Sequence, residues 1–125
     1  MIKTIKNIPK RVVSAMKYSL SGLKLSFKHE ESIRLETISL ILLILILFLV
    51  HWPLWKKLSL VAIFLLIPLT ELLNSALEDL CDLISPELHP SIKAAKDKGS
   101  AAVLVAIVIG LIGLAVLIVC PNTIS

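Results

Sequence analysis

Residues 101–120 contain no charged side chain, and this run constrains the fold more than any other feature of the sequence. A helix of that length spans roughly 30 Å, the thickness of the hydrocarbon core of a bilayer. The composition of the 125-residue chain agrees, since 57% of its residues are hydrophobic and 18% are charged. A soluble domain of this size cannot bury so many apolar side chains. We therefore predict an integral membrane protein.

Three transmembrane helices are predicted, over about residues 33–52, 58–84 and 100–120. In the first, the purely apolar stretch 38–50 is shorter than a bilayer core, so flanking residues must complete the span before Pro53 ends it. The second contains Pro68, at which we expect a kink that neighbouring helices accommodate. The fold class is thus an all-α membrane protein.

A further helix is predicted at about residues 9–28, where apolar side chains recur at helical spacing and basic side chains lie between them. Its apolar members are Val12, Val13, Met16, Leu20, Leu23 and Phe27. Such an amphipathic helix lies in the membrane interface. We expect a single domain over residues 1–125, made of this surface helix and the three transmembrane helices.

The distribution of basic residues predicts the orientation. Seven lysines and arginines precede Glu30, three lie in the predicted loop 85–99, two (Lys56 and Lys57) lie in the turn at 52–57, and none follows Cys120. The positive-inside rule places the N-terminus and the 85–99 loop in the cytoplasm and the C-terminus outside. We expect a multi-pass protein of the cytoplasmic (inner) membrane. Nucleic-acid binding is not expected, because base-reading and stacking residues are missing from the basic segment.

A polar stripe is predicted within the second transmembrane segment. Glu71, Asn74, Glu78 and Asp82 are spaced 3, 4 and 4 apart, so at about 100° per residue they share one helix face. Glu71 lies roughly 20 Å along the predicted helix, which starts at residue 58, and so about 10 Å inside the cytoplasmic boundary. An ionisable side chain at that depth is costly unless it meets a partner, an ion or water.

Two interpretations of this stripe follow from the residues alone. Glu71 forms an interhelical hydrogen bond or an ion pair with Arg34, or the stripe binds a ligand. Carboxylates near Lys93, Lys96 and Lys98 suit a divalent metal held on a polyphosphate, although a solvated loop is the ordinary fate of a lysine cluster. Glycine-rich phosphate loops, zinc-ligand spacing and nucleophilic triads are missing from the sequence.

The segments ELLNSALE (71–78) and AKDKGSAAV (95–103) resemble the prokaryotic diacylglycerol kinase family. Asp82 and His89 also fit, and the resemblance extends over almost the whole chain through Tyr18-Ser19, Gly22-Leu23, Glu30, Arg34 and Glu36. It implies an ATP-dependent lipid kinase that forms homotrimers with active sites between subunits. The implied reaction is direct in-line phosphorylation of diacylglycerol to phosphatidic acid at the cytoplasmic face.

The resemblance also implies site residues. Glu71 matches the general base, Glu30 and Glu78 match the Mg²⁺ ligands, and Asn74 matches a supporting residue. Besides those two metal ligands, the ATP contacts match Arg11, Tyr18, Glu87, His89, Lys96 and Asp97. The lipid contacts match Arg11, Ser19, Arg34, Glu71 and Ser100.

Alternatives remain open at this point. The related undecaprenol kinases share most of these motifs, although the GSAAV form (99–103) resembles the diacylglycerol branch more. A small proton or cation transporter subunit explains a buried Glu71 but not the gathering of Glu30, Lys96 and Asp97 at one face. A non-catalytic assembly subunit is a third possibility. The chain departs from the family at Ser14, where relatives often have a basic residue, at Leu20, where they often have tryptophan, and at Pro68.

Overall fold

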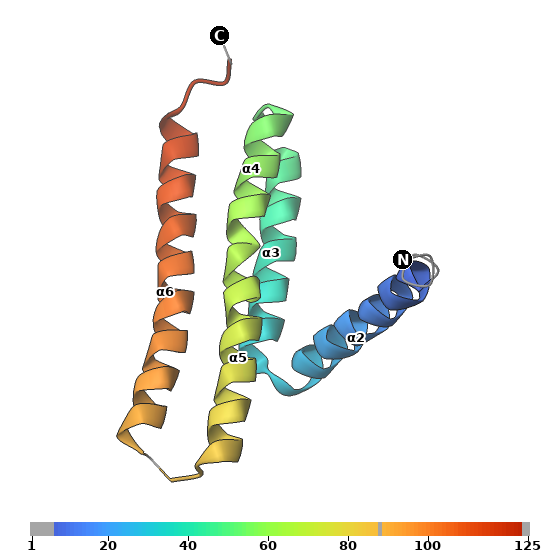
Figure 1. The fold of residues 1–125 in the computed structure, drawn as a ribbon. Coiled ribbons are helices and arrows are strands. Elements are labelled where there is room, and N and C mark those ends of the chain that lie inside the picture. Colours follow the sequence, from blue (N-terminus) through green and yellow to red (C-terminus); the bar gives the residue numbers. More distant parts are fainter. Residues whose placement is uncertain (1–6, 88, 124–125) are drawn as a thin grey trace. The chain divides into compact units, whose positions relative to one another are not determined.

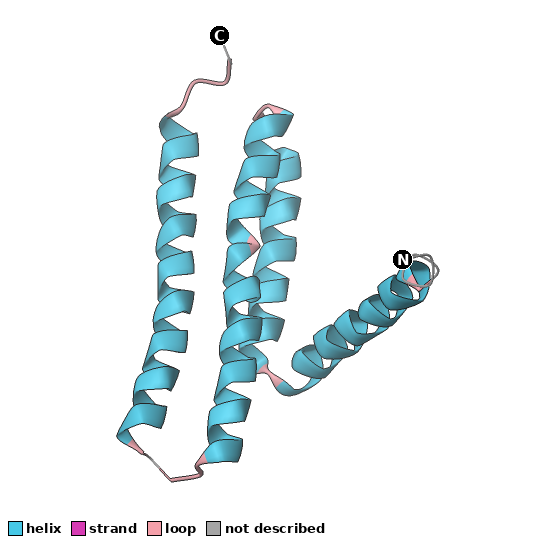
Figure 2. Ribbon diagram, in the orientation of Figure 1, coloured by secondary structure: helices cyan, strands magenta, loops and turns pink. Residues whose placement is uncertain are grey.

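The computed structural model describes residues 7–87 and 89–123, and these residues form helices joined by short turns (Figure 1). Figure 2 shows no strand in this part of the chain, so the predicted all-α class is confirmed. The chain divides into two compact units, Met1–Glu31 and Ser32–Ser125. The expectation of one domain over residues 1–125 stays a prediction.

The first unit contains α2, Ile8–His29, in agreement with the amphipathic helix predicted at 9–28. Pro9 lies in the first turn, where a missing backbone N–H breaks no helical hydrogen bond. The backbone N–H of Glu30 donates to the carbonyl of Ser26 at 2.8 Å and closes the last turn. No side chain of α2 is buried, and the apolar Met16 and Leu20 are about three-fifths exposed. A position on the membrane surface remains a prediction, and Lys3 and Lys6 lie outside the described residues.

Three helical segments are long and apolar enough to cross a membrane: Glu31–Leu49, Leu54–Ile84 and Pro90–Val119. The first is α3, Glu31–Leu49, which ends three residues before Trp52 because the chain turns towards Pro53. The second consists of α4, Leu54–Phe64, and α5, Leu66–Ile84, and the third is α6, Pro90–Val119. The three predicted transmembrane helices are thus confirmed.

The predicted disturbance at Pro68 takes the form of an interruption between α4 and α5 at Leu65. Pro68 has no N–H to donate to the carbonyl three to four residues before it, so the helical hydrogen-bond ladder is broken there. The hydroxyl of Thr70 donates to the carbonyls of Leu66 and Ile67, each at 2.9 Å. Leu65 keeps right-handed helical angles, φ −65° and ψ −18°, so the disturbance is local.

Two predicted boundaries are wrong. The second crossing segment begins at Leu54 and not near residue 58, so Lys56 and Lys57 lie on α4 and not in a turn. The third begins at Pro90 and not near residue 100, so the predicted 85–99 loop is mostly helix and Lys93, Lys96 and Lys98 lie on its first turns. Membrane thickness limits only the apolar part of a helix, and charged side chains do not end one.

The start of α6 is well determined by local chemistry. The Nδ1 atom of His89 accepts a hydrogen bond from the backbone N–H of Ser91 at 3.2 Å, and Pro90 occupies the first helical turn. An N-cap acceptor followed by proline is a typical helix start. The side chain of His89 therefore has a structural role.

A hydrophobic core lies where α3, α4 and α6 meet. Leu47, Leu60 and Leu117 are buried there, and Trp52, Trp55 and Phe64 are among the side chains packed around them. Most other large apolar side chains are exposed, as expected for surfaces that meet lipid or another subunit. Cys81 and Cys120 are both free.

Two glycines in the apolar half of α6 lie at its contact with the preceding crossing segment. A Cβ added at Gly113 would lie 2.9 Å from Cδ1 of Ile63, so α4 and α6 approach closely at that point. At Gly110 the nearest atom would be 3.6 Å away, an ordinary van der Waals contact. Of these two glycines, only Gly113 marks a position where a small residue is needed for close packing.

Candidate active site

The polar face of α5 is present as the sequence predicts. Asn74 is buried, and its Nδ2 atom donates a hydrogen bond to Oε1 of Glu78 at 3.2 Å. The two residues are one helical turn apart, at the spacing that brings side chains together on a helix. Glu71 lies one turn earlier and, like Glu78, is half-buried. The structure therefore brings a buried amide and two carboxylates onto one side of α5.

The start of α6 supplies a cation to the far end of this stripe. The Nζ atom of Lys96 donates to Oδ1 of Asp82 at 2.6 Å, which joins α6 to α5 across the turn between them. The lysine side chain is 32% exposed and that of Asp82 is 64% exposed. An ammonium group has three donors, and water can reach both groups. Lys96 thus lies beside the acidic stripe, and the pair is open to an incoming ligand.

Asp97 has a different partner although it follows Lys96 directly. Its Oδ2 atom accepts from Nζ of Lys93 at 2.6 Å, and both side chains are more than 60% exposed. This is an i, i+4 pair along the surface of α6, a kind of contact that contributes little to stability. Ser100 is exposed one turn after Lys96.

The turn between α5 and α6 contains the next predicted nucleotide contact. The carbonyl of Glu87 accepts hydrogen bonds from the Ser85 hydroxyl and from the backbone N–H of His89, both at 2.8 Å. The Glu87 and His89 side chains are exposed. The backbone carbonyl of Glu87 thus joins Ser85 and His89.

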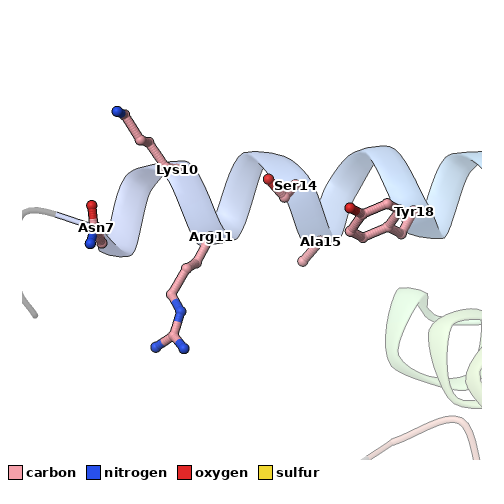
Figure 3. A pocket seen from close by; sticks show the side chains of 6 residues that line it. All are labelled: Asn7, Lys10, Arg11, Ser14, Ala15 and Tyr18. Atoms are coloured by element: carbon pink, nitrogen blue, oxygen red, sulfur yellow. The ribbon is translucent and has the colours of Figure 1, made fainter.

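Arg11, Tyr18 and Ser19 lie on α2, in the first unit. Figure 3 shows Lys10 and Arg11 pointing to opposite edges of the helix, and Tyr18 two turns after Arg11. A shallow surface hollow runs along this side of α2 and is lined by Asn7, Lys10, Arg11, Ser14, Ala15 and Tyr18. Tyr18 is 76% exposed. Ser14 leaves the middle of the hollow without a charge.

The predicted metal ligands come from different units. Glu30 is the C-cap of α2 in the first unit, and Glu78 lies on α5 in the second. The described residues contain no group of three or more histidine, cysteine or acidic side chains that could hold a metal ion. Mg²⁺ on a nucleotide needs fewer, because one or two carboxylates share it with phosphate oxygens and water. Glu78 fits this role, since the bond from Asn74 orients its carboxylate.

Three membrane-crossing segments and a cluster of carboxylate, amide and lysine side chains on α5 and α6 define a class of protein. This is a small polytopic membrane protein with a polar site where one crossing helix ends and the next begins. The profile of the family described as "Prokaryotic diacylglycerol kinase" matches residues 17–119. The chain belongs to this family.

Curated relatives agree over most of their length. A diacylglycerol kinase of Pseudomonas aeruginosa is 39% identical over 100 residues, which cover 80% of this chain and 81% of the relative. That of Escherichia coli K12 is 34% identical over 102 residues, 82% of this chain and 84% of the relative. That of Haemophilus influenzae is 38% identical over 98 residues, 78% and 83% respectively. The expected enzyme class, a lipid phosphotransferase of the diacylglycerol kinase type, is thus confirmed.

Sequence reasoning missed two residues of the second unit. Gly99 faces the buried Asn74, and Lys56 is buried against α6. Gly99 lies within a motif that the resemblance uses, and only the packing of α5 on α6 shows what it contacts. For Lys56, the neighbouring Trp52 and Trp55 were a signal, because aromatic faces attract an ammonium group.

Proposed function

We propose that this protein transfers the γ-phosphoryl group of ATP to the hydroxyl of diacylglycerol and so forms phosphatidic acid at the cytoplasmic membrane face. The observation that carries the proposal is the hydrogen-bonded Asn74–Glu78 pair on α5, in line with Glu71 and beside Lys96 of α6. Relatives at 34–39% identity are named diacylglycerol kinase, which supports this lipid as the substrate.

The chemistry needs positioning and charge neutralisation more than covalent help. The lipid hydroxyl oxygen attacks the γ-phosphorus, the bond to the β–γ bridging oxygen breaks, and ADP leaves with that oxygen. Glu71 accepts the proton of the lipid hydroxyl. A base must lie within hydrogen-bond reach of the proton it takes. Glu71 is only half-buried, so a lipid hydroxyl can approach its carboxylate.

The depth of Glu71 suits a lipid substrate. Because the crossing segment begins at Leu54, Glu71 lies roughly 26 Å along it, close to one boundary of a hydrocarbon core of about 30 Å. The hydroxyl of a diacylglycerol lies just below the headgroups, near the same level. Arg11, Ser19, Arg34 and Ser100 are the other residues proposed to contact the lipid.

Lys96 is proposed to neutralise negative charge on the ATP phosphates. It is paired with Asp82, and the exposure of both side chains allows a phosphate to join or replace that contact. Glu30 and Glu78 would hold Mg²⁺, which neutralises phosphate charge when it is bound. The remaining nucleotide contacts are proposed to come from Arg11, Tyr18, Glu87, His89 and Asp97.

An apolar groove offers a place for the acyl chains. It lies between α3, the α4–α5 segment and α6, has a volume of about 570 Å³, and includes Phe64, Ile107 and Leu114 in its lining. Glu36 and Ser39 are its polar members, and both come from the first half of α3. Apolar clefts of several hundred Å³ with a few polar groups are typical of ligand sites.

A homotrimer in the cytoplasmic membrane is part of the proposal. The many exposed apolar side chains of α3 and α6 support contacts beyond one chain, with lipid or with further copies. Lys93, Lys96 and Lys98 on the first turns of α6 favour a cytoplasmic location for that end, so the N-terminus would lie in the cytoplasm and the C-terminus outside.

A lipid phosphorylation assay tests the function. Purified protein in mixed micelles is given Mg-ATP with diacylglycerol, with undecaprenol, or with neither lipid, and phosphorylated lipid is measured. We expect product with diacylglycerol at a rate well above that with undecaprenol. Preferred phosphorylation of undecaprenol would replace the proposed substrate, and no phosphorylated lipid in any arm would reject the proposal.

A further inference from the structure

In the polar region of the α5–α6 contact, Asn74 of α5 lies directly against Gly99 of α6. A Cβ placed on Gly99 would lie well under 3.0 Å from Oδ1 of Asn74, and real Cβ atoms essentially never come that near another heavy atom. The next neighbour, Cδ2 of Leu77, would lie at 3.0 Å. Glycine is thus the one residue that leaves room for the Asn74 carboxamide against α6.

The orientation of this carboxamide follows from its other neighbour. Oε1 of Glu78 can only accept a hydrogen bond when the carboxylate is ionised, so the atom of Asn74 that faces it must be Nδ2. The planar amide then directs Oδ1 towards Gly99. Oδ1 is buried and has no hydrogen-bond partner among the described residues, so packing and not hydrogen bonding holds that side of the amide.

We infer that Gly99 is a positioning residue for the phosphoryl transfer and acts on Glu78 through Asn74. A methyl group at position 99 would displace Oδ1, and because the amide is rigid, Nδ2 would move away from Oε1 of Glu78. The carboxylate would lose the bond that orients it. This inference rests on the proposed function, in which Glu78 is a ligand of the nucleotide-bound Mg²⁺.

The chain contains a matched control on the same helix. Gly110 also lies within α6, but a Cβ there would meet its nearest neighbour, a ring carbon of Phe64, at 3.6 Å. Gly99→Ala and Gly110→Ala therefore make the same chemical change and give the same gain in helix propensity. Only Gly99→Ala forces a collision with a polar side chain.

The experiment measures diacylglycerol-dependent ADP release against Mg²⁺ concentration for full-length wild type, Gly99→Ala, Gly110→Ala, Asn74→Ala and the double variant Asn74→Ala/Gly99→Ala. We expect Gly99→Ala and Asn74→Ala each to raise the half-saturating Mg²⁺ concentration by about tenfold, the order of one hydrogen bond to a charged group. Gly110→Ala should match wild type. The double variant should be no worse than Asn74→Ala, because the colliding side chain is gone.

Thermal denaturation of the same five proteins separates this inference from the proposed function. Gly99→Ala should lower the Tm by roughly 5 °C in the wild-type background and leave it unchanged or raised in the Asn74→Ala background. If wild type releases no ADP, the proposed function fails, and the Tm values still decide whether Gly99 and Asn74 are coupled.

Several results would overturn the inference. An unchanged Mg²⁺ requirement in Gly99→Ala would show that the glycine does not act on Glu78. An additional loss in the double variant would show that its effect does not pass through Asn74. If Gly99→Ala cannot be purified in folded form, the double variant decides: it must fold and match Asn74→Ala, and its failure to do so contradicts the inference.

Discussion

Two lysines connect α6 to the α4–α5 segment, one near each end of α6. They differ in exposure and in the groups that they contact. Lys56 of α4 is only 1% exposed, and its Nζ atom donates to the carbonyls of Leu117, at 2.8 Å, and of Cys120. Lys96 of α6 is 32% exposed at its side chain and has the carboxylate of Asp82 as its partner. The first is enclosed by protein, and the second is open to solvent.

The environment of Lys56 explains why a buried charge is tolerated there. The last carbonyls of a helix have no partner within it and carry partial negative charge, so an ammonium group satisfies them. The Nζ atom also lies over the rings of Trp52 and Trp55, 5.3 and 5.7 Å from their centres. Such contacts favour a cation most when water is excluded. Lys56 thus serves as a C-terminal cap for α6 and has little capacity left for a ligand.

The Lys96 end, which we call the polar end, differs because its carboxylates are only partly enclosed by protein. Asp82 is 64% exposed, Glu71 and Glu78 are half-buried, and Oδ1 of Asn74 has no hydrogen-bond partner in the described part of the chain. Carboxylates that water or a ligand can reach are able to share a metal ion with phosphate oxygens. The comparison therefore assigns stability to the Lys56 end and chemistry to the Lys96 end.

The largest effect is expected for Glu71→Gln at the polar end. The amide cannot accept the hydroxyl proton as a base, so turnover should fall by about 10²–10⁴-fold. Binding of Mg-ATP should change little. Diacylglycerol-dependent ADP release and equilibrium nucleotide binding measure the two quantities. Turnover near that of wild type would remove Glu71 from the role of base.

The next effect is expected at the other end, for Lys56→Met. Loss of the ammonium group leaves two carbonyls at the end of α6 unsatisfied, which costs about 1–3 kcal/mol of stability. Thermal denaturation in detergent should show a lower Tm, while the Mg²⁺ requirement of the folded enzyme stays as in wild type. Lys57→Met is the control, since Lys57 is the next residue of α4 and is half-buried. Equal losses in the two variants would contradict the capping role.

A smaller effect is expected for Asp82→Asn. The substitution removes a negative charge that competes with phosphate for Lys96, so the KM for Mg-ATP should fall by about two- to fivefold while kcat changes less. Initial rates against Mg-ATP concentration measure the effect. A rise in KM would mean that Asp82 holds Lys96 in place for the nucleotide, and the Lys96 end would then resemble the Lys56 end more closely than proposed.

The smallest effect is expected for Lys93→Ala. Its pair with Asp97 lies on the surface of α6, and exposed pairs of this spacing contribute about 0.3–0.5 kcal/mol. The Tm should change by no more than a degree or two, and activity should stay close to that of wild type. A large loss of activity would show that Asp97 depends on Lys93 for its proposed contact with the nucleotide.

The parts of this molecule that depend on helical periodicity could be predicted from its sequence. Glu71, Asn74 and Glu78 share a face because their spacing is close to one turn, and this holds in whatever way the helices pack. The start of α6 was misplaced by ten residues because the prediction was based on the length of the apolar run. His89 and Pro90 form a helix start that the sequence does contain.

Contacts between helices could not be predicted in the same way. Lys56 meets carbonyls more than sixty residues later in the chain, and Gly99 meets Asn74 only because α5 and α6 pack in one particular register. A lysine near a membrane boundary is ordinarily interpreted as solvated, and a glycine in a membrane helix as a packing residue. Tertiary packing decides these roles, and local patterns do not contain it.

The most direct test of the central claim is a Mg²⁺ titration of lipid phosphorylation by wild type and by Glu78→Gln. The account predicts that wild type phosphorylates diacylglycerol and that Glu78→Gln needs at least about tenfold more Mg²⁺ for half its maximal rate, or is inactive. Superimposable titrations of the two proteins would contradict the account, because the carboxylate held by Asn74 would then have no part in binding the metal.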